Sequence, residues 1–514
     1  MDETLWTQHQ GLPVATALGT TSAHRDLIPV DDPATRQTIG WCEDNDADDV
    51  DRAVTGADEA FASWATDWSA RREAMIRGAE AIARQEAVLA ATLVSEVGKP
   101  LFEAAHDIHG AVHLLRTFAD LAEESTEVVD LTGRAGTGSA DEVLLHRVPV
   151  GPVAIVTPWN APGYLTFNCV GPALAAGCTV IVKPAESAPL GVTAMLRLLA
   201  EHLPKGVLQI VQGTGPRAGA ALTAHPRVRG VLFVGGVVAG RRVLAQAAAT
   251  IKKVSLELGG NDPALVLDDA RIDAAMVREM IAGAFSVSGQ VCFAIKRVYV
   301  HRSRHEELVG ALRSAIDQLV MGPGAHDGVH IGPLTTEHGF QNARRLREAA
   351  LAAGANVYEG GVDGSEGALE QGRFVRPAIV TELPGDHELV LAEQFAPLLP
   401  VIPFDTDDEA IAEANRTEFG LASSVWSADP DHARDVAMRV EAGNTFINAH
   451  RVGASVPLVP FGGVKQSGLG RNHLMHAIGE CMEEHAVVRY TDPARQINGI
   501  DPWPDVRAVD ANAR

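Results

Sequence analysis

One cysteine stands in a sequence setting that suits chemistry. Cys292 follows a glycine by three positions, in the polar segment 288–293. A thiol in such a loop can act as a nucleophile if its thiolate is stabilised. No histidine lies close by in the sequence to act as its base, so a protease-type Cys/His pair is not indicated. The structural alternative is a buried cysteine that packs as a small apolar side chain.

Two further polar side chains interrupt or follow apolar segments. Glu257 lies between two leucines, and a carboxylate in such surroundings is costly unless it is partnered. Desolvation would raise its pKa and suit it to act as a general base near neutral pH. Asn160 follows an apolar run, and its amide can donate to a developing oxyanion. The structural alternatives are a capping or interface carboxylate and an Asn that stabilises a turn.

Several segments have the features of a nucleotide site. Lys183 and Glu186 follow a strand-like run, where a carboxylate can accept the hydroxyls of a ribose and repel a 2′-phosphate. Gly213, Gly235 and Gly236 follow other strand-like runs, where backbone amides can approach a phosphate. The pattern is not G-x-G-x-x-G. An exposed ion pair and ordinary glycine turns are the alternatives.

The elements that must position these residues alternate between strand and helix. Strand-like runs separate helical patterns at 164–176, 188–203 and 216–224, which predicts a parallel sheet with helices on both faces. A helical region at 50–125, broken at 98–100, comes first, and a second α/β block at 262–450 follows. Ligands in such sheets bind at the carboxyl ends of the strands.

Composition excludes several classes of protein. The 514 residues are 46 % apolar and 21 % charged, as in ordinary globular proteins and unlike disordered chains. The net charge of −23 argues against a nucleic acid or an anionic membrane surface as partner. The five cysteines are scattered, so no disulfide framework and no metal site is expected. Without a secretory signal or a long apolar run, a cytoplasmic protein is expected.

The ordered set Asn160, Glu257, Cys292 and Glu393, with the glycine-rich segment 460–471, resembles the NAD(P)-dependent aldehyde dehydrogenase superfamily over about residues 25–490. The resemblance implies an α/β fold in three parts and a homodimer or homotetramer. The three implied parts are a Rossmann-like NAD-binding domain (1–131 and 150–258), an α/β catalytic domain (259–475) and a small β oligomerisation flap (132–149 and 476–514).

The resemblance also implies catalytic roles. Cys292 would attack the carbon of a small-molecule aldehyde, and the Asn160 side chain and the Cys292 N–H would hold the oxyanion. Hydride would pass to NAD, which Glu186 favours over NADP, and Glu257 would activate the water that hydrolyses the thioester. The implied cofactor-binding residues are Thr157, Trp159, Lys183, Glu186, Gly213, Gly235, Gly236, Leu258, Glu393 and Phe395.

The substrate is indicated only by position. Arg451 can pair with the carboxylate of a semialdehyde, although an outward-facing arginine is the alternative, and an aromatic aldehyde is the other substrate class considered. Glu483 is expected where some members carry a proton-relay glutamate. The residues expected to line the substrate tunnel are Leu165, Asn168, Val291, Phe293, His450, Arg451, Ser455 and Phe461.

Two positions depart from the family pattern. Gly236 stands where a serine commonly meets a phosphate, so the grip on the cofactor is expected to differ. Cys169 stands where a lysine is common, and the loss of that cation would raise the pKa of Glu257. A CoA-acylating enzyme and an inactive binding homologue are the alternative functions. Glu257 favours hydrolysis over acyl transfer to CoA, and the presence of Asn160, Glu257 and Cys292 favours an enzyme.

Overall fold

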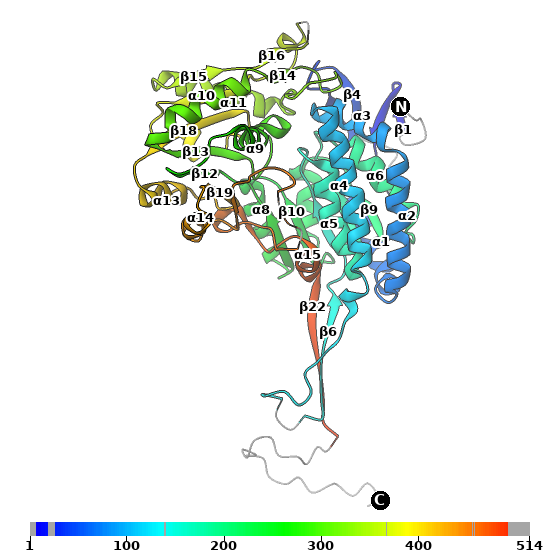
Figure 1. Ribbon diagram of the computed structural model, residues 1–514. Coiled ribbons are helices and arrows are strands. Elements are labelled where there is room, and N and C mark those ends of the chain that lie inside the picture. The colour runs from blue at the N-terminus through cyan, green and yellow to red at the C-terminus, as the bar shows by residue number, and fades with distance from the viewer. Residues whose placement is uncertain are drawn as a thin grey trace, which may run out of the picture.

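The computed structural model describes residues 7–18, 26–137, 140–365, 367–454, 456 and 458–491. Two α/β parts lie side by side, and a long β-ribbon projects away from them (Figure 1). Within these residues no helix combines the length and the apolar character that a membrane span requires.

The predicted helical region at 50–125 is confirmed as four helices, and the break predicted at 98–100 falls between the last two. Asp46 caps the first helix by accepting from the backbone of Asp49, whose side chain in turn accepts from the Asp46 backbone. Gly98, with φ 88°, ends the third helix in the left-handed conformation that glycine adopts most easily. The helices are α1 (Ala47–Trp64), α2 (Trp68–Arg84), α3 (Glu86–Val97) and α4 (Leu101–Asp120).

The first sheet confirms the predicted parallel pairing. Its order is β21-β11-β10-β7-β8-β9, and only the short β21 runs antiparallel to its neighbour. The buried helices α5 (Pro162–Ala176) and α6 (Leu190–Ala200) pack against it. The strands are β7 (Val153–Val156), β8 (Val180–Lys183), β9 (Leu208–Ile210), β10 (Gly230–Val234), β11 (Lys253–Glu257) and β21 (Gly468–Leu469).

The second sheet has the order β15-β17-β18-β13-β12-β19-β20, with β15 alone antiparallel. Its helices include α9 (Ala274–Phe285), α10 (His305–Ile316), α13 (Asp407–Asn415) and α14 (Pro430–Ala437). The strands are β12 (Asp262–Val266), β13 (Ile295–His301), β15 (Asn356–Glu359), β17 (Ala378–Thr381), β18 (Leu398–Phe404), β19 (Ala422–Trp426) and β20 (Asn444–Ile447).

The projecting ribbon joins two segments that are far apart in the sequence (Figure 1). Strand β22 (Met482–Arg489) pairs antiparallel with β6 (Glu142–Pro149) along its whole length. Both strands leave valines exposed to solvent, among them Val148, Val487 and Val488. Exposed apolar side chains on a ribbon that stands away from the core are a surface that another chain can cover.

A buried ion pair fastens α4 to the first sheet's helices. The Lys99 ammonium and the Asp107 carboxylate lie 2.9 Å apart with side chains only 1 % and 2 % exposed. The other oxygen of Asp107 accepts from the backbone N–H of Tyr164, in the first turn of α5. A buried charge that loses its partner is strongly destabilising.

Substitution Asp107→Asn should therefore lower the free energy of unfolding by about 3–5 kcal/mol, because Lys99 is left buried without a counter-charge. The amide oxygen can still accept from Tyr164, so the charge is what changes. The matched control is Asp120→Asn on the same helix, whose pair with Arg72 is half exposed and should matter by less than about 1 kcal/mol. Urea unfolding followed by circular dichroism measures both, and equal midpoints for the two variants would contradict the expectation.

Candidate active site

A cavity of about 210 Å³ lies where the carboxyl ends of the first sheet's strands meet the second part of the chain. It brings together residues from five separate segments, as expected for the carboxyl edge of a parallel sheet. Its lining is Pro158, Trp159, Asn160, Leu165, Val234, Gly235, Gly236, Glu257, Leu258, Gly259, Cys292, Glu393 and Phe395.

Glu257 and Cys292 meet in this cavity. Glu257 is the last residue of β11, and Cys292 lies in the loop before β13. The Cys292 Sγ is 3.8 Å from the Glu257 Oε1. The other carboxylate oxygen accepts from the Asn472 side-chain amide. Burial raises the pKa of Glu257 to about 7, while the hydrogen bonds from Asn472 and Cys292 lower it. The carboxylate is thus placed and poised to take the thiol proton.

The Cys292 thiol needs such a base. Burial, and then the charge of Glu257, raise the pKa of this thiol well above its ordinary value, and the Lys296 ammonium works in the opposite direction. The resting sulfur is therefore protonated near neutral pH, and it becomes a nucleophile when its proton is removed.

Two hydrogen-bond donors border the same cavity. The Asn160 amide nitrogen donates to the Gln290 carbonyl at 2.8 Å, which leaves its second hydrogen available. The backbone N–H of Cys292 has no acceptor within hydrogen-bond distance among the residues that the structure describes. Two free donors beside a nucleophile can stabilise an oxyanion that forms on the attacked group.

The loop that carries Cys292 is held in a strained conformation. Val287 and Ser288 have φ values of 50° and 56°, which are unfavourable for residues with a Cβ, and for a β-branched valine above all. The Glu103 carboxylate accepts from the Val287 N–H at 2.9 Å, and Ser288 Oγ donates to the Gly332 carbonyl at 2.9 Å. Sequence reasoning missed these supports, because their partners are far apart along the chain. Strain of this kind persists only where surrounding contacts fix it.

The remainder of the cavity, together with the end of β8 beside it, fits a dinucleotide. The buried Lys183 ammonium lies 3.2 Å from the half-exposed Glu186 carboxylate. Gly259 packs directly on the Glu393 carboxylate, where a Cβ would not fit, whereas a Cβ at Gly236 would meet open space. Burial raises the pKa of Glu393 to about 7, and Lys296 lowers it. These carboxylates can accept ribose hydroxyls, and the open glycine turn leaves room for phosphates.

Of the ten predicted cofactor-binding residues, six line this cavity, and Thr157, Lys183, Glu186 and Gly213 do not. Trp159 and Phe395 pack edge to face, with ring centroids 5.7 Å apart. Thr157 is buried behind the cavity, where its hydroxyl lies 2.8 Å from that of Thr166. Lys183 ends β8, Glu186 follows it and Gly213 follows β9, so these three residues lie at the same edge of the sheet but outside the cavity lining.

The structure places the predicted substrate residues in different settings. Leu165 lines the cavity, and Phe293 packs edge to face against Phe461 at 5.5 Å. Asn168 and Val291 are buried. Ser455 lies outside the described residues.

His450 and Arg451 already have protein partners. The imidazole of His450 is fully buried and lies 2.9 Å from both Ser424 Oγ and the Phe293 carbonyl. Arg451 is 45 % exposed, and its Nε lies 2.8 Å from both carboxylate oxygens of Glu279. A substrate carboxylate would have to compete with Glu279 for this arginine.

The expectation for Glu483 is wrong. Its side chain is exposed on β22, opposite Val148 in the projecting ribbon. The residue that contacts Glu257 from this end of the chain is Asn472. The chain pairs with β11 as β21, places Asn472 against the Glu257 carboxylate three residues after that strand, and only then leaves for the ribbon. No acidic residue marks this contact, so the sequence carried no signal for it.

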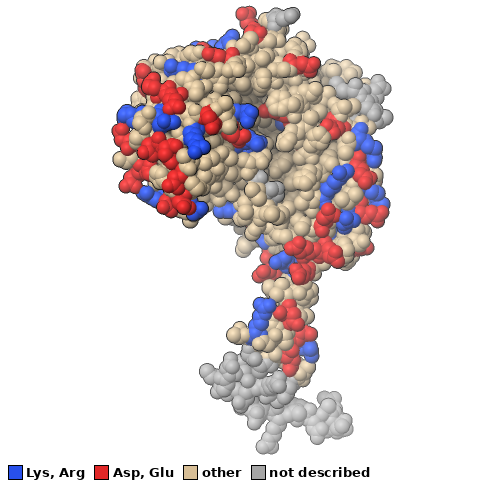
Figure 2. All heavy atoms as spheres, viewed as in Figure 1, with Lys and Arg blue, Asp and Glu red and all other residues tan. Residues whose placement is uncertain are grey.

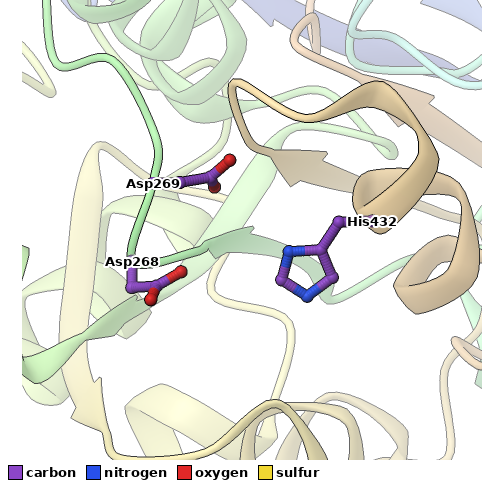
Figure 3. Close-up of side chains that lie close together, drawn as sticks. All are labelled: Asp268, Asp269 and His432. Atoms are coloured by element: carbon purple, nitrogen blue, oxygen red, sulfur yellow. The ribbon is translucent and has the colours of Figure 1, made fainter.

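A second polar cluster lies at the opposite edge of the second sheet. Asp268 and Asp269 follow the carboxyl end of β12, whereas Cys292 precedes the amino end of the parallel β13, and His432 approaches from α14 (Figure 3). His432 pairs with Asp407 at 2.7 Å, which raises the pKa of the imidazole. This part of the surface is rich in acidic side chains (Figure 2). An exposed ion pair accounts for the cluster.

Comparisons with known proteins agree with the site. A sequence model of the "Aldehyde dehydrogenase family" matches residues 20–487. Glutarate-semialdehyde dehydrogenase of Pseudomonas aeruginosa is 35 % identical over 458 residues, which cover 89 % of this chain and 92 % of that protein. The NADP-dependent succinate-semialdehyde dehydrogenase of Escherichia coli is 34 % identical over 460 residues, which cover 89 % of this chain and 93 % of that one.

Solved structures show the same architecture. Betaine aldehyde dehydrogenase of Staphylococcus aureus in complex with NAD⁺ superimposes with a TM-score of 0.86 at 28 % identity, covering 92 % of this chain and 93 % of that one. A crystal structure titled as an NADP-dependent enzyme of E. coli gives 0.87 at 32 % identity, covering 95 % of this chain and 99 % of that one. The predicted fold class is confirmed.

The pKa of Glu257 leads to a measurable pH dependence of Cys292 reactivity. Iodoacetamide reacts with thiolates, so alkylation should accelerate as pH rises through about 7, where the Glu257 carboxylate becomes able to take the thiol proton. Glu257→Gln should slow alkylation by about 100-fold and remove this inflection, because a positioned base contributes at least that much. Asn472→Leu should move the inflection to higher pH, because it removes a hydrogen bond that lowers the Glu257 pKa.

Mass spectrometry of the alkylated peptide measures the rate. The other four cysteines are buried and report any loss of structure, so they serve as the internal control. An identical inflection near pH 7 in Glu257→Gln would show that another group accepts the proton.

Proposed function

Because this chain is a member of the aldehyde dehydrogenase family, we propose that it oxidises an aldehyde to a carboxylic acid through a thioester on Cys292. The observation that carries the proposal is the Cys292–Glu257 pair, with the sulfur 3.8 Å from a carboxylate oxygen, in a cavity that Asn160 also lines. Nucleophile, base and amide donor then meet at one place, as the reaction requires.

The first step is addition of the thiol to the aldehyde. Glu257 takes the Cys292 proton, and the sulfur bonds to the carbonyl carbon while the carbonyl π electrons move to oxygen. The Asn160 amide and the Cys292 N–H donate to the resulting oxyanion. Such donors are worth about 100- to 1,000-fold in rate, because they are already oriented when the charge develops.

The second step releases the acid. A nicotinamide bound in the cavity would supply the acceptor for the hydride that leaves the hemithioacetal carbon, which would leave a thioester on Cys292. Glu257 first releases to solvent the proton that it took from Cys292. It then takes a proton from a water molecule, and the resulting hydroxide oxygen bonds to the thioester carbon. The carbon–sulfur bond then breaks and Cys292 leaves as a thiolate. Glu257 thus favours water over CoA as the acceptor of the acyl group.

The cofactor is held by residues at the ends of the strands. Lys183 and Glu186 would hold the adenine ribose, and Glu393 the nicotinamide ribose, with Trp159 and Phe395 packed beside it. We infer a preference for NAD, because the Glu186 carboxylate would repel a 2′-phosphate. Relatives include an NADP-dependent enzyme and an NAD⁺ complex, so the charge of Glu186 is the argument specific to this chain.

An anionic semialdehyde is the proposed substrate class. Two relatives are named for glutarate semialdehyde and succinate semialdehyde. A third, from Pseudomonas putida, is named for 3-sulfolactaldehyde and is 34 % identical over 461 residues. Arg451 is the candidate cation. It would give up its ion pair with Glu279 and bind the substrate carboxylate instead. The Phe293–Phe461 pair favours an aromatic aldehyde as the second candidate, because two edge-to-face rings offer an apolar surface.

The ribbon of β6 and β22 supports an assembly of this chain. We propose a homodimer or homotetramer in which its exposed valines are covered, with the three domains divided as the sequence predicts. The five free cysteines are consistent with the reducing cytoplasm as its location.

A panel of aldehydes tests the activity. Incubation with NAD and glutarate semialdehyde, benzaldehyde or a neutral aliphatic aldehyde should produce NADH, followed by its absorbance, and Cys292→Ala should abolish it. The product should be the free acid with or without CoA.

Arg451→Ala should reduce kcat/KM for the semialdehyde about tenfold and leave kcat/KM for benzaldehyde unchanged. A CoA ester as main product would refute the hydrolytic mechanism, and equal losses on both aldehydes would refute the role of Arg451.

The cofactor preference gives a separate prediction. The ratio of kcat/KM for NAD over NADP should exceed about tenfold, and Glu186→Gln should reduce this ratio by about tenfold, the equivalent of 1.4 kcal/mol. The reason is that the variant removes the repelling charge and releases Lys183 for a phosphate. Glu201→Gln, an exposed glutamate after α6, is the control. A wild-type preference for NADP would contradict the inference.

A further inference from the structure

A buried lysine beneath the nucleophile has no role in the mechanism so far. Lys296, in the second position of β13, is 1 % exposed. Its ammonium donates to the Val291 carbonyl and, at 3.3 Å, to the Cys292 carbonyl. Among the described residues no carboxylate oxygen lies within 4.0 Å of it.

Keeping the Lys296 ammonium charged in this buried position costs free energy. A buried charge without a directly paired counter-charge costs several kcal/mol, and burial lowers the pKa of Lys296 accordingly, although Glu393 and Asp262 raise it. An apolar side chain of similar length would fill the same space without this cost. Groups of this kind concentrate at functional sites, which directs attention to what the ammonium binds.

The ammonium binds the peptide group on which oxyanion stabilisation depends. The Val291 carbonyl and the Cys292 N–H belong to one planar trans peptide, so they point in opposite directions. A donor that holds the carbonyl on the buried side therefore turns the N–H away from itself. This N–H has no acceptor among the described residues, and Cys292 lines the cavity together with Asn160.

Lys296 is also connected to the cofactor side of the cavity. The Gln394 side chain donates to the Lys296 carbonyl at 2.8 Å, and the Phe395 ring centroid lies 5.5 Å from the ammonium. Lys296 is thus fixed by the segment that carries Glu393, and its position does not depend on the Cys292 loop alone.

We propose that Lys296 is a positioning residue that holds the Val291–Cys292 peptide with its N–H directed at the oxyanion. This role rests on the proposed function, because it requires that an aldehyde adds to Cys292. Without the lysine the peptide can rotate, and the N–H loses its fixed direction.

The test compares Lys296→Met and Lys296→Gln with the wild type on a good aldehyde substrate. Lys296→Met should lower kcat about 100-fold, the loss expected for one oxyanion donor. Lys296→Gln keeps a donor and should recover at least tenfold of that loss. The dissociation constant for NAD, from quenching of intrinsic fluorescence, should change less than twofold.

Alkylation of Cys292 by iodoacetamide separates positioning from loss of the fold. Displacement of iodide forms no oxyanion. Both variants lose the Lys296 charge, which lowers the pKa of the thiol, so their alkylation should slow to the same extent, whereas kcat should fall further in Lys296→Met than in Lys296→Gln. Lys252→Met is the matched control, since the Lys252 ammonium likewise binds two backbone carbonyls and burial lowers its pKa to about 8. It should retain wild-type kcat.

Two results would overturn the proposal. One is a kcat for Lys296→Met within threefold of wild type. The other is alkylation that falls in proportion to kcat in both Lys296 variants, which would assign the lysine to the thiol or to the stability of the loop. A wild-type protein that oxidises no aldehyde would instead refute the proposed function.

Discussion

The contact between the Cys292 thiol and the Glu257 carboxylate sets the conditions for the rest of the site. Glu257 is buried and Cys292 is partly exposed. Desolvation raises the pKa of each group, so neither is charged without a cost near neutral pH. The ionisation of the thiol and the protonation of the carboxylate are coupled, because the proton that the thiol must lose is the one that the carboxylate can accept. Asn472 on one side and Lys296 on the other then adjust the balance through a hydrogen bond and a charge.

The two α/β parts of the fold each contribute one member of this pair. Glu257 ends a strand of the first sheet, and Cys292 precedes a strand of the second. The loop between them is strained at Val287 and Ser288, so it needs supports from outside itself, and Glu103 of α4 supplies one. The helical region at the start of the chain thereby takes part in the geometry of the nucleophile.

Sequence reasoning succeeded where the signal is local and failed where it depends on distant contacts. The alternation of strands and helices predicted the parallel sheets, since β-branched runs between helical patterns leave few other arrangements. The residue types at 160, 257 and 292 singled out three side chains that the structure brings to one cavity. Asn472, Glu103 and Lys296 were missed, because an amide, a helical glutamate and a strand lysine have no distinctive pattern. Glu483 was placed by position along the chain, and the path of the backbone at β21 and β22 decided otherwise.

The pairing of β6 with β22 has a consequence for biosynthesis. The first strand is synthesised before most of both sheets, and its partner follows only after both α/β parts have been made. Until then β6 has an open edge, a state that invites association with other nascent chains. Closure of the ribbon must therefore wait until the long segment between the two strands has been synthesised, and any assembly built on the ribbon comes later still.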